Sequence, residues 1–201
     1  MPNFEKLNNP SNGEVITFKN GKPIIPNNPI VPFIRGDGTG VDIWPATRRV
    51  IDASIQKSYG DKRKINWFKV YAGDEACDIY GTYNYLPNDT IEAIKHYGVA
   101  IKGPLTTPVG GGIRSLNVAL RQIFDLYSCV RPCKYYSGTP SPHKSPQNLD
   151  IIVYRENTED IYMGIEWEAE DENCKSLINY LNNTIIPNSS KLKNRSLPLS
   201  A

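Results

Sequence analysis

A set of polar side chains in the middle of the chain has the chemistry needed to bind a small polyanion. Asn117 and Arg121 are four residues apart, so a helix would carry both on one face. If Ser115 begins that helix, its free backbone N–H groups and the positive end of its dipole favour an anion. Arg131 and Arg155 follow, and guanidinium groups bind carboxylates by paired hydrogen bonds. Taken singly, each arginine is more simply explained as a surface residue or as half of a structural ion pair.

A loop that suits phosphate or ribose oxygens runs from Lys102 to Gly112. It combines a cation at Lys102, hydroxyl groups at Thr106 and Thr107, and glycines at 110–112. The loop follows an apolar run, and open α/β sheets bind ligands at the carboxyl ends of their strands. The alternative is a surface loop punctuated by proline and glycine, and the residues alone do not decide between the two.

Gly36, Gly38 and Gly40 lie between a predicted strand and a predicted helix, which is the context of a dinucleotide-binding fingerprint. Their spacing differs from that fingerprint, and no acidic residue stands clearly at the end of a second strand. A tight turn from strand to helix is the favoured interpretation.

Tyr162 lies in a polar segment, 155–162, between two predicted strands. A tyrosine in such a place can be an acid catalyst, or it can pack with its hydroxyl group satisfied. The sequence does not separate these roles.

Histidines and cysteines provide no metal-ligating motif. His96 and His143 have no second ligand at helical spacing and are predicted to lie at the surface. Of the four cysteines, only Cys129 and Cys133 are close in sequence, and two ligands do not make a zinc site. We therefore predict free thiols, a reducing compartment and no metal ligand in this chain.

Alternating strands and helices are predicted to position the residues up to Lys102. Apolar runs predict strands at 29–34, 65–71 and 99–101. Helical periodicity predicts helices between them, beginning at Asp42 and Pro87. This alternation predicts an α/β domain with a largely parallel sheet. The helix residues expected to share inward faces are Ile43, Thr47, Val50, Ile51 and Ile55 in the first helix and Ile91 and Ile94 in the second.

The second half of the chain is predicted to hold a helix from Ser115, strands at 151–154 and 161–167, and a helix at 172–181. Arg155 would close a buried strand and would then need a carboxylate partner. The helix from Ser115 is expected to carry one apolar side, made of Leu116, Ala119, Leu120, Ile123 and Tyr127. We predict an arm with little regular structure at 1–29, an α/β domain at 30–127, and a second domain at 128–201 that ends in a polar tail.

Charge and hydropathy exclude several classes of partner. Lys and Arg number 23 against 21 Asp and Glu, so bulk charge favours neither nucleic acid nor an anionic membrane. No apolar run reaches the roughly 18 residues that a membrane helix needs. The first residues lack the basic start and apolar core of a secretory signal. We expect a cytoplasmic location.

Five motifs, in one order, resemble the bacterial-type NADP-dependent isocitrate dehydrogenases of the isocitrate/isopropylmalate dehydrogenase family. They lie at residues 33–40, 102–112, 114–121, 130–132 and 155–162. The resemblance runs from about Pro29 to about Asn188. It implies the two-domain α/β fold of that family, with a partial large domain and the beginning of a small one.

The resemblance also implies roles for the polar residues. Ser115 and Asn117 would bind the terminal carboxylate of isocitrate. The other carboxylates would be bound by Arg121, Arg131 and Arg155.

Three further residues would serve the reaction. Thr106 would contact NADP, Lys102 would lie near the reacting centre, and Tyr162 would help to protonate the enolate that remains after CO2 departs. The implied chemistry is hydride transfer from C2 of isocitrate to NADP and loss of CO2 assisted by Mg²⁺ or Mn²⁺, giving 2-oxoglutarate. The family works as a homodimer in the tricarboxylic acid cycle and the glyoxylate bypass.

The sequence departs from the family in two respects. Arg35 stands where the family more often has Glu, and only a local effect is expected. The family also continues well beyond this length, with metal-binding aspartates, a lysine from the second subunit and an adenosine-phosphate pocket. We therefore expect an N-terminal portion that is inactive as given.

Two alternatives stay open. The first is an isopropylmalate-type dehydrogenase, which the polar pair Ser115 and Asn117 disfavours because an isopropyl group requires an apolar residue. The second is a truncated product without catalytic function.

Overall fold

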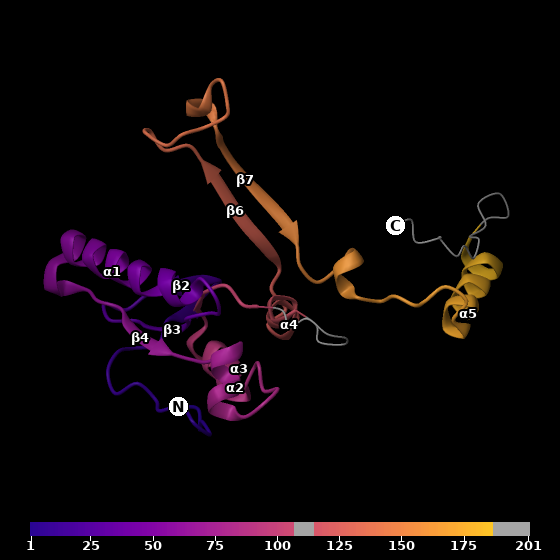
Figure 1. Ribbon diagram of the computed structural model, residues 1–201, viewed down its shortest axis with the longest axis horizontal. Helices are drawn as coiled ribbons and strands as arrows, with labels where there is room; N and C mark the ends of the chain where they lie inside the picture. Colours follow the sequence, from indigo (N-terminus) through magenta and orange to yellow (C-terminus); the bar gives the residue numbers. More distant parts are fainter. Residues whose placement is uncertain (107–114, 187–201) are drawn as a thin grey trace. The chain divides into compact units, whose positions relative to one another are not determined.

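The computed structural model describes residues 1–106 and 115–186 of the chain (Figure 1). The predictions for Thr107, the glycines at 110–112, Arg114 and the tail at 187–201 lie outside these residues. The chain forms two compact units, Met1–Leu126 and Tyr127–Ala201.

The first unit is built on a parallel three-stranded sheet with the strand order β4–β3–β5. The strands are β3 (Ile30–Ile34), β4 (Asn66–Lys69) and β5 (Ile101–Lys102). Every residue of β3 is buried, as is typical of a central parallel strand with a continuous apolar run. The predicted α/β class and parallel sheet are confirmed.

The helices of this unit are α1 (Gly40–Tyr59), which continues into a 3₁₀ turn at Gly60–Lys62, α2 (Asp74–Tyr80), α3 (Asn88–Tyr97) and α4 (Leu116–Ile123). Successive side chains of a strand point to opposite faces. Phe33 stacks on Trp44 of α1, with ring centroids 4.3 Å apart, whereas Ile34 joins Tyr97 of α3 in the main core cluster. Thus α1 and α3 lie on opposite faces of β3.

The inward face predicted for α1 is largely wrong. Trp44 is buried, whereas Ile43 and Val50 are 49% and 66% exposed. Trp44 sets the orientation of the helix because its ring packs on Phe33 and against the edge of Trp67. The aliphatic spacing used for the prediction left this aromatic residue out.

The predictions of the inward faces of α3 and α4 are partly right. In α3, Ala93 and Tyr97 are buried, while Ile91 and Ile94 are only half-buried. In α4, Leu116 and Leu120 are buried as predicted. Because α4 ends at Ile123, Tyr127 lies outside the helix and is exposed, contrary to the prediction.

Residues 1–29 are more ordered than the predicted arm. They include a hairpin of β1 (Thr17–Lys19) and β2 (Lys22–Ile24), and Leu7 is part of the core cluster. The Asp89 carboxylate, in the first turn of α3, accepts hydrogen bonds from the backbone N–H groups of residues 5–7 at 2.8, 2.8 and 3.2 Å. It also accepts one from the Tyr80 hydroxyl at 2.7 Å. One buried carboxylate therefore attaches the N-terminal segment to α3.

The second unit contains an antiparallel ribbon of β6 (Ser128–Lys134) and β7 (Asp150–Glu156), drawn as two long arrows in Figure 1. A 3₁₀ turn at Pro146–Asn148 precedes β7, and another at Asp160–Met163 follows it. Helix α5 (Glu172–Tyr180) confirms the helix predicted there, and it runs into a π turn at Leu181–Ile185. Its N-cap is Asp171, whose carboxylate accepts the N–H of Asn173 at 2.8 Å.

One strand of the second unit, β6, was not predicted, and two expectations for this unit are wrong. Residues 161–167 form no strand, because the 3₁₀ turn ends at Gly164, whose φ of 72° lies in the left-handed region. Strand β7 is present as predicted, but its apolar residues are exposed rather than buried.

Within the described ranges, no helix combines the length and apolar character that crossing a membrane requires.

Candidate functional site

The first unit brings three of the candidate residues to the wall of one pocket. Lys102 lies at the end of β5, and Asn117 and Arg121 lie one turn apart on α4. All three line a pocket of about 540 Å³ whose apolar wall includes Ile34 and Leu120. The buried face of α4 thus holds the helix in place while its polar residues reach the pocket.

Lys102 is electrostatically perturbed in this pocket. Its Nζ donates a hydrogen bond to the carbonyl oxygen of Gly103 at 2.8 Å. Desolvation and then the charge of Arg121 lower the pKa of Lys102, and the carboxylate of Asp37 opposes them. The net pKa of Lys102 is therefore lowered, which favours the neutral amine, as a proton-transfer role would require.

Ser115 is the N-cap residue of α4, as the sequence predicts. Its side chain makes no capping hydrogen bond to the helix. The hydroxyl group is therefore not used to satisfy the first turn of α4.

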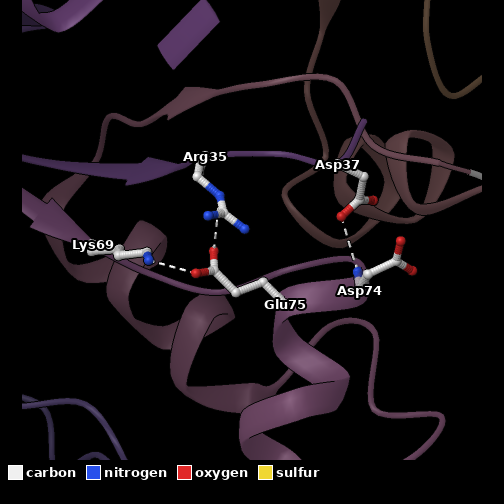
Figure 2. Close-up of polar contacts among 5 residues, drawn as sticks. All are labelled: Arg35, Asp37, Lys69, Asp74 and Glu75. Carbon is white, nitrogen blue, oxygen red and sulfur yellow. Dashed lines mark hydrogen bonds and ion pairs between the residues drawn. The ribbon is translucent and has the colours of Figure 1, made fainter. Parts of the chain in front are cut away.

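Asp37 joins the loops that follow the three parallel strands. Its Oδ1 accepts the N–H of Asp74 at 3.0 Å (Figure 2), and its Oδ2 accepts the N–H of Thr106 at 2.9 Å. Its own N–H donates to the carbonyl oxygen of Pro104 at 2.8 Å. This buried carboxylate therefore fixes the backbone of Thr106, whose side chain is exposed. The sequence did not single out Asp37, although it stands at the centre of the glycine turn.

Arg35 takes part in a cluster of ion pairs with Glu75 and Lys69. Its Nε lies 3.5 Å from Oε2 of Glu75, and the same carboxylate pairs with Lys69 at 2.5 Å (Figure 2). The ion pairs connect β4 and the end of β3 to the first turn of α2.

Position 73 requires glycine because its backbone lies against the Asp37 carboxylate. Its φ is 75°, and a Cβ there would overlap the Asp37 carboxylate. We expect Gly73→Ala to lower the free energy of unfolding by about 3 kcal/mol or more, because a backbone cost of about 1–2 kcal/mol adds to the collision. Gly81→Ala is the matched control, since its φ is 103° but a Cβ there meets nothing within 4 Å. Chemical denaturation of both variants measures the difference, and equal losses would contradict the role given to Asp37.

In the second unit, two candidate arginines share one face of the β6–β7 ribbon. Cys129 pairs with Arg155, and Arg131 pairs with Val153, two positions further along. Side chains alternate between faces, so Arg131 and Arg155 are diagonal neighbours, a relation that places Cβ atoms roughly 7–8 Å apart. Two cations at this spacing suit a ligand with more than one carboxylate.

Among the side chains that the structure describes, Arg155 contacts Tyr162. The guanidinium carbon lies 4.3 Å from the centroid of the Tyr162 ring. Hydrogen bonds with the Tyr162 hydroxyl and then with Cys129 raise the pKa of Arg155. Arg155 is half-buried, whereas the other residues of β7 are exposed.

The turn that joins β7 to Tyr162 is held by Glu156. Its Oε1 accepts the backbone N–H groups of Asn157, Thr158 and Glu159, each at 2.9 Å. These hydrogen bonds lower the pKa of Glu156. Asn157 is buried and accepts the Cys129 thiol at 2.9 Å. The density of polar residues was the only signal in the sequence for Glu156 and Asn157, and it assigned no role to either.

Metal-ligating groups do not gather in the part of the chain that the structure describes. No three or more His, Cys, Asp or Glu residues there form a group that could hold a metal ion. These residues do not fit a divalent cation site by themselves. All four cysteines are free, as predicted, and His96 and His143 are exposed.

Comparison with known proteins identifies the family. The family model described as isocitrate/isopropylmalate dehydrogenase matches residues 30–187. The chain belongs to this family, and the expected fold is confirmed.

Curated relatives named isocitrate dehydrogenase [NADP] are similar over nearly all of the chain. A protein from Nostoc sp. is 68% identical over 198 residues, which are 98% of this chain and 42% of the relative. One from Coxiella burnetii is 57% identical over 164 residues, or 82% of this chain and 38% of the relative. The crystal structure of the TT0538 protein from Thermus thermophilus matches with a TM-score of 0.55 and 31% identity, over 80% of this chain and 29% of that one. The chain therefore spans less than half the length of these relatives.

Proposed function

We propose that this chain belongs to an enzyme that oxidises and decarboxylates isocitrate to 2-oxoglutarate with NADP as the hydride acceptor. The observation that carries the proposal is the convergence of Lys102, Asn117 and Arg121 on one pocket. The relatives named isocitrate dehydrogenase [NADP] support it.

Five residues are assigned to substrate binding by the resemblance to the family. Ser115 and Asn117 bind the terminal carboxylate of isocitrate, where the N-terminus of α4 adds its positive dipole end. Arg121, Arg131 and Arg155 bind the remaining carboxylates. In this proposal residues 30–127 belong to the large domain and residues 128–201 to the small one.

Catalytic roles are assigned to Lys102 and Tyr162. Thr106 would contact NADP, which would supply the hydride acceptor for oxidation at C2. Lys102, with its lowered pKa, lies near the reacting centre and exchanges a proton there. Tyr162, beside Arg155, gives a proton to the enolate carbon after CO2 departs. The described residues offer no site for Mg²⁺ or Mn²⁺, so no step is assigned to the metal. The enzyme is further proposed to be a homodimer in the cytoplasm.

Isocitrate is preferred to an isopropylmalate-type substrate because of Ser115 and Asn117. A hydroxyl group and an amide suit a carboxylate, and an isopropyl group would leave them without hydrogen bonds.

The test is a chimera in which residues 1–201 replace the matching part of the Nostoc relative. Reduction of NADP is followed by absorbance with isocitrate or 3-isopropylmalate and Mg²⁺. We expect turnover with isocitrate and at least a hundredfold lower kcat/KM with 3-isopropylmalate. The unmodified Nostoc relative is the positive control. A folded chimera that does not use isocitrate, or that prefers 3-isopropylmalate, would contradict the proposal.

A further inference from the structure

Cys129 lies at the junction of the side chains in the second unit that are proposed to act on isocitrate. It faces Arg155 directly across the β6–β7 ribbon. Its Sγ donates a hydrogen bond to Oδ1 of Asn157 at 2.9 Å. Cys129 is half-buried, and Asn157 is only 4% exposed. The thiol thus connects the β6 strand to the turn that leads from Arg155 to Tyr162.

Arg155 lies between Cys129 and Tyr162. Its guanidinium group lies over the Tyr162 ring, and Cys129 is its directly opposite neighbour across the ribbon. A long arginine side chain loses rotational freedom when it binds a carboxylate, and contacts that fix it beforehand reduce that cost. Without the thiol, the turn at Asn157 would lose a hydrogen bond that connects it to β6, and Arg155 would lose the side chain that faces it across the ribbon.

We infer that Cys129 is a positioning residue for isocitrate binding, acting through Arg155 and through the turn at Asn157. The inference rests on the proposed function. Cys133, further along β6 on the same face, offers a matched comparison. Its thiol is exposed, and its Sγ lies 3.7 Å from the carbonyl oxygen of Arg131 in its own strand.

Kinetics of the chimera test the inference with Cys129→Ala, Cys129→Ser and Cys133→Ala. A thiol is a weaker donor than a hydroxyl or amide group, so loss of its hydrogen bond predicts a KM for isocitrate about two- to tenfold higher in Cys129→Ala. The KM for NADP should stay within about twofold, because the proposed NADP contact is elsewhere. Cys129→Ser keeps a hydroxyl donor and should recover most of the affinity. Cys133→Ala should match the unsubstituted chimera.

Thermal unfolding of the full 201-residue chain separates positioning from a structural role. A structural role alone would lower Tm and the yield of active enzyme and leave both KM values unchanged. That result overturns the inference, as does an equal KM for Cys129→Ala and Cys129→Ser. If Cys129→Ala does not fold, Cys129→Val, which suits a strand and lacks the donor, takes its place. Absence of isocitrate turnover in the unsubstituted chimera overturns the proposed function instead, so the two failures are distinguishable.

Discussion

Arg121→Ala is expected to lower kcat/KM for isocitrate at least tenfold in the chimera. Arg121 lines the same pocket as Asn117 and Lys102. A hydrogen bond to a charged group contributes about 1.5–3 kcal/mol, and every 1.4 kcal/mol corresponds to about a factor of ten. Loss of a paired interaction with a carboxylate should therefore lower kcat/KM by tens to hundreds of fold. Steady-state kinetics with varied isocitrate measures the change.

Arg49→Ala is the matched control for Arg121. Arg49 is an exposed arginine on α1, outside the pocket. Its removal changes the net charge by the same amount and should leave kcat/KM unchanged. A normal kcat/KM in Arg121→Ala would remove Arg121 from the substrate site, and equal losses in both variants would indicate a general effect of charge.

Asp89→Ala is expected to lower the free energy of unfolding by about 3–5 kcal/mol. The variant leaves three backbone N–H groups of residues 5–7 and the Tyr80 hydroxyl without their acceptor. Each buried polar group left without a hydrogen bond costs about 1–3 kcal/mol. The total is smaller than four such costs because some of these groups can move to form hydrogen bonds with water. Urea denaturation of the 201-residue chain measures the loss.

Glu92→Ala provides the control on the same helix. Its side chain is 58% exposed, and its Oε1 lies 3.9 Å from Nζ of Lys95, so the change should cost less than about 1 kcal/mol. A loss below about 1 kcal/mol in Asp89→Ala would mean that the N-terminal segment does not depend on this carboxylate.

The contribution of Asp89 should also depend on pH. Burial by itself raises the pKa of Asp89, but the hydrogen bonds from residues 5–7 and Tyr80 outweigh it, and the net pKa lies below its usual value. A depressed pKa means that the stabilisation is fully present above the unfolded pKa of about 3.9 and is lost as pH falls through the folded value. The difference in stability between the wild-type chain and Asp89→Ala should be constant above about pH 5 and shrink below about pH 4. The opposite trend would contradict this assignment.

The sequence predicted the sheet well because its strands are apolar runs between turn residues. Every residue of β3 is buried, and Ile101 of β5 is half-buried. The apolar residues that predicted these strands are therefore the residues that the core buries. The polar face of α4 was also predictable, since a spacing of four residues places Asn117 and Arg121 together in any helix.

Strand β6 was missed for a physical reason. Pro132 cannot donate a hydrogen bond and argues against a central strand. Yet in the part of the chain that the structure describes β6 pairs with β7 alone, and an edge strand tolerates proline. Residues such as Asp37 and Asn157 were missed because their partners lie in other segments, and only the folded chain brings these together.

The hydrogen bonds of Asp89 to residues 5–7 join positions 82–84 residues apart in sequence. Contacts at such separation close a long loop and form only after the entropy of that loop has been lost. The N-terminal segment is therefore expected to join α3 after the folding transition state. Interactions absent from that state leave the folding rate nearly unchanged and slow unfolding instead. By this reasoning the N-terminal segment contributes to the kinetic persistence of the native unit rather than to the speed with which it forms.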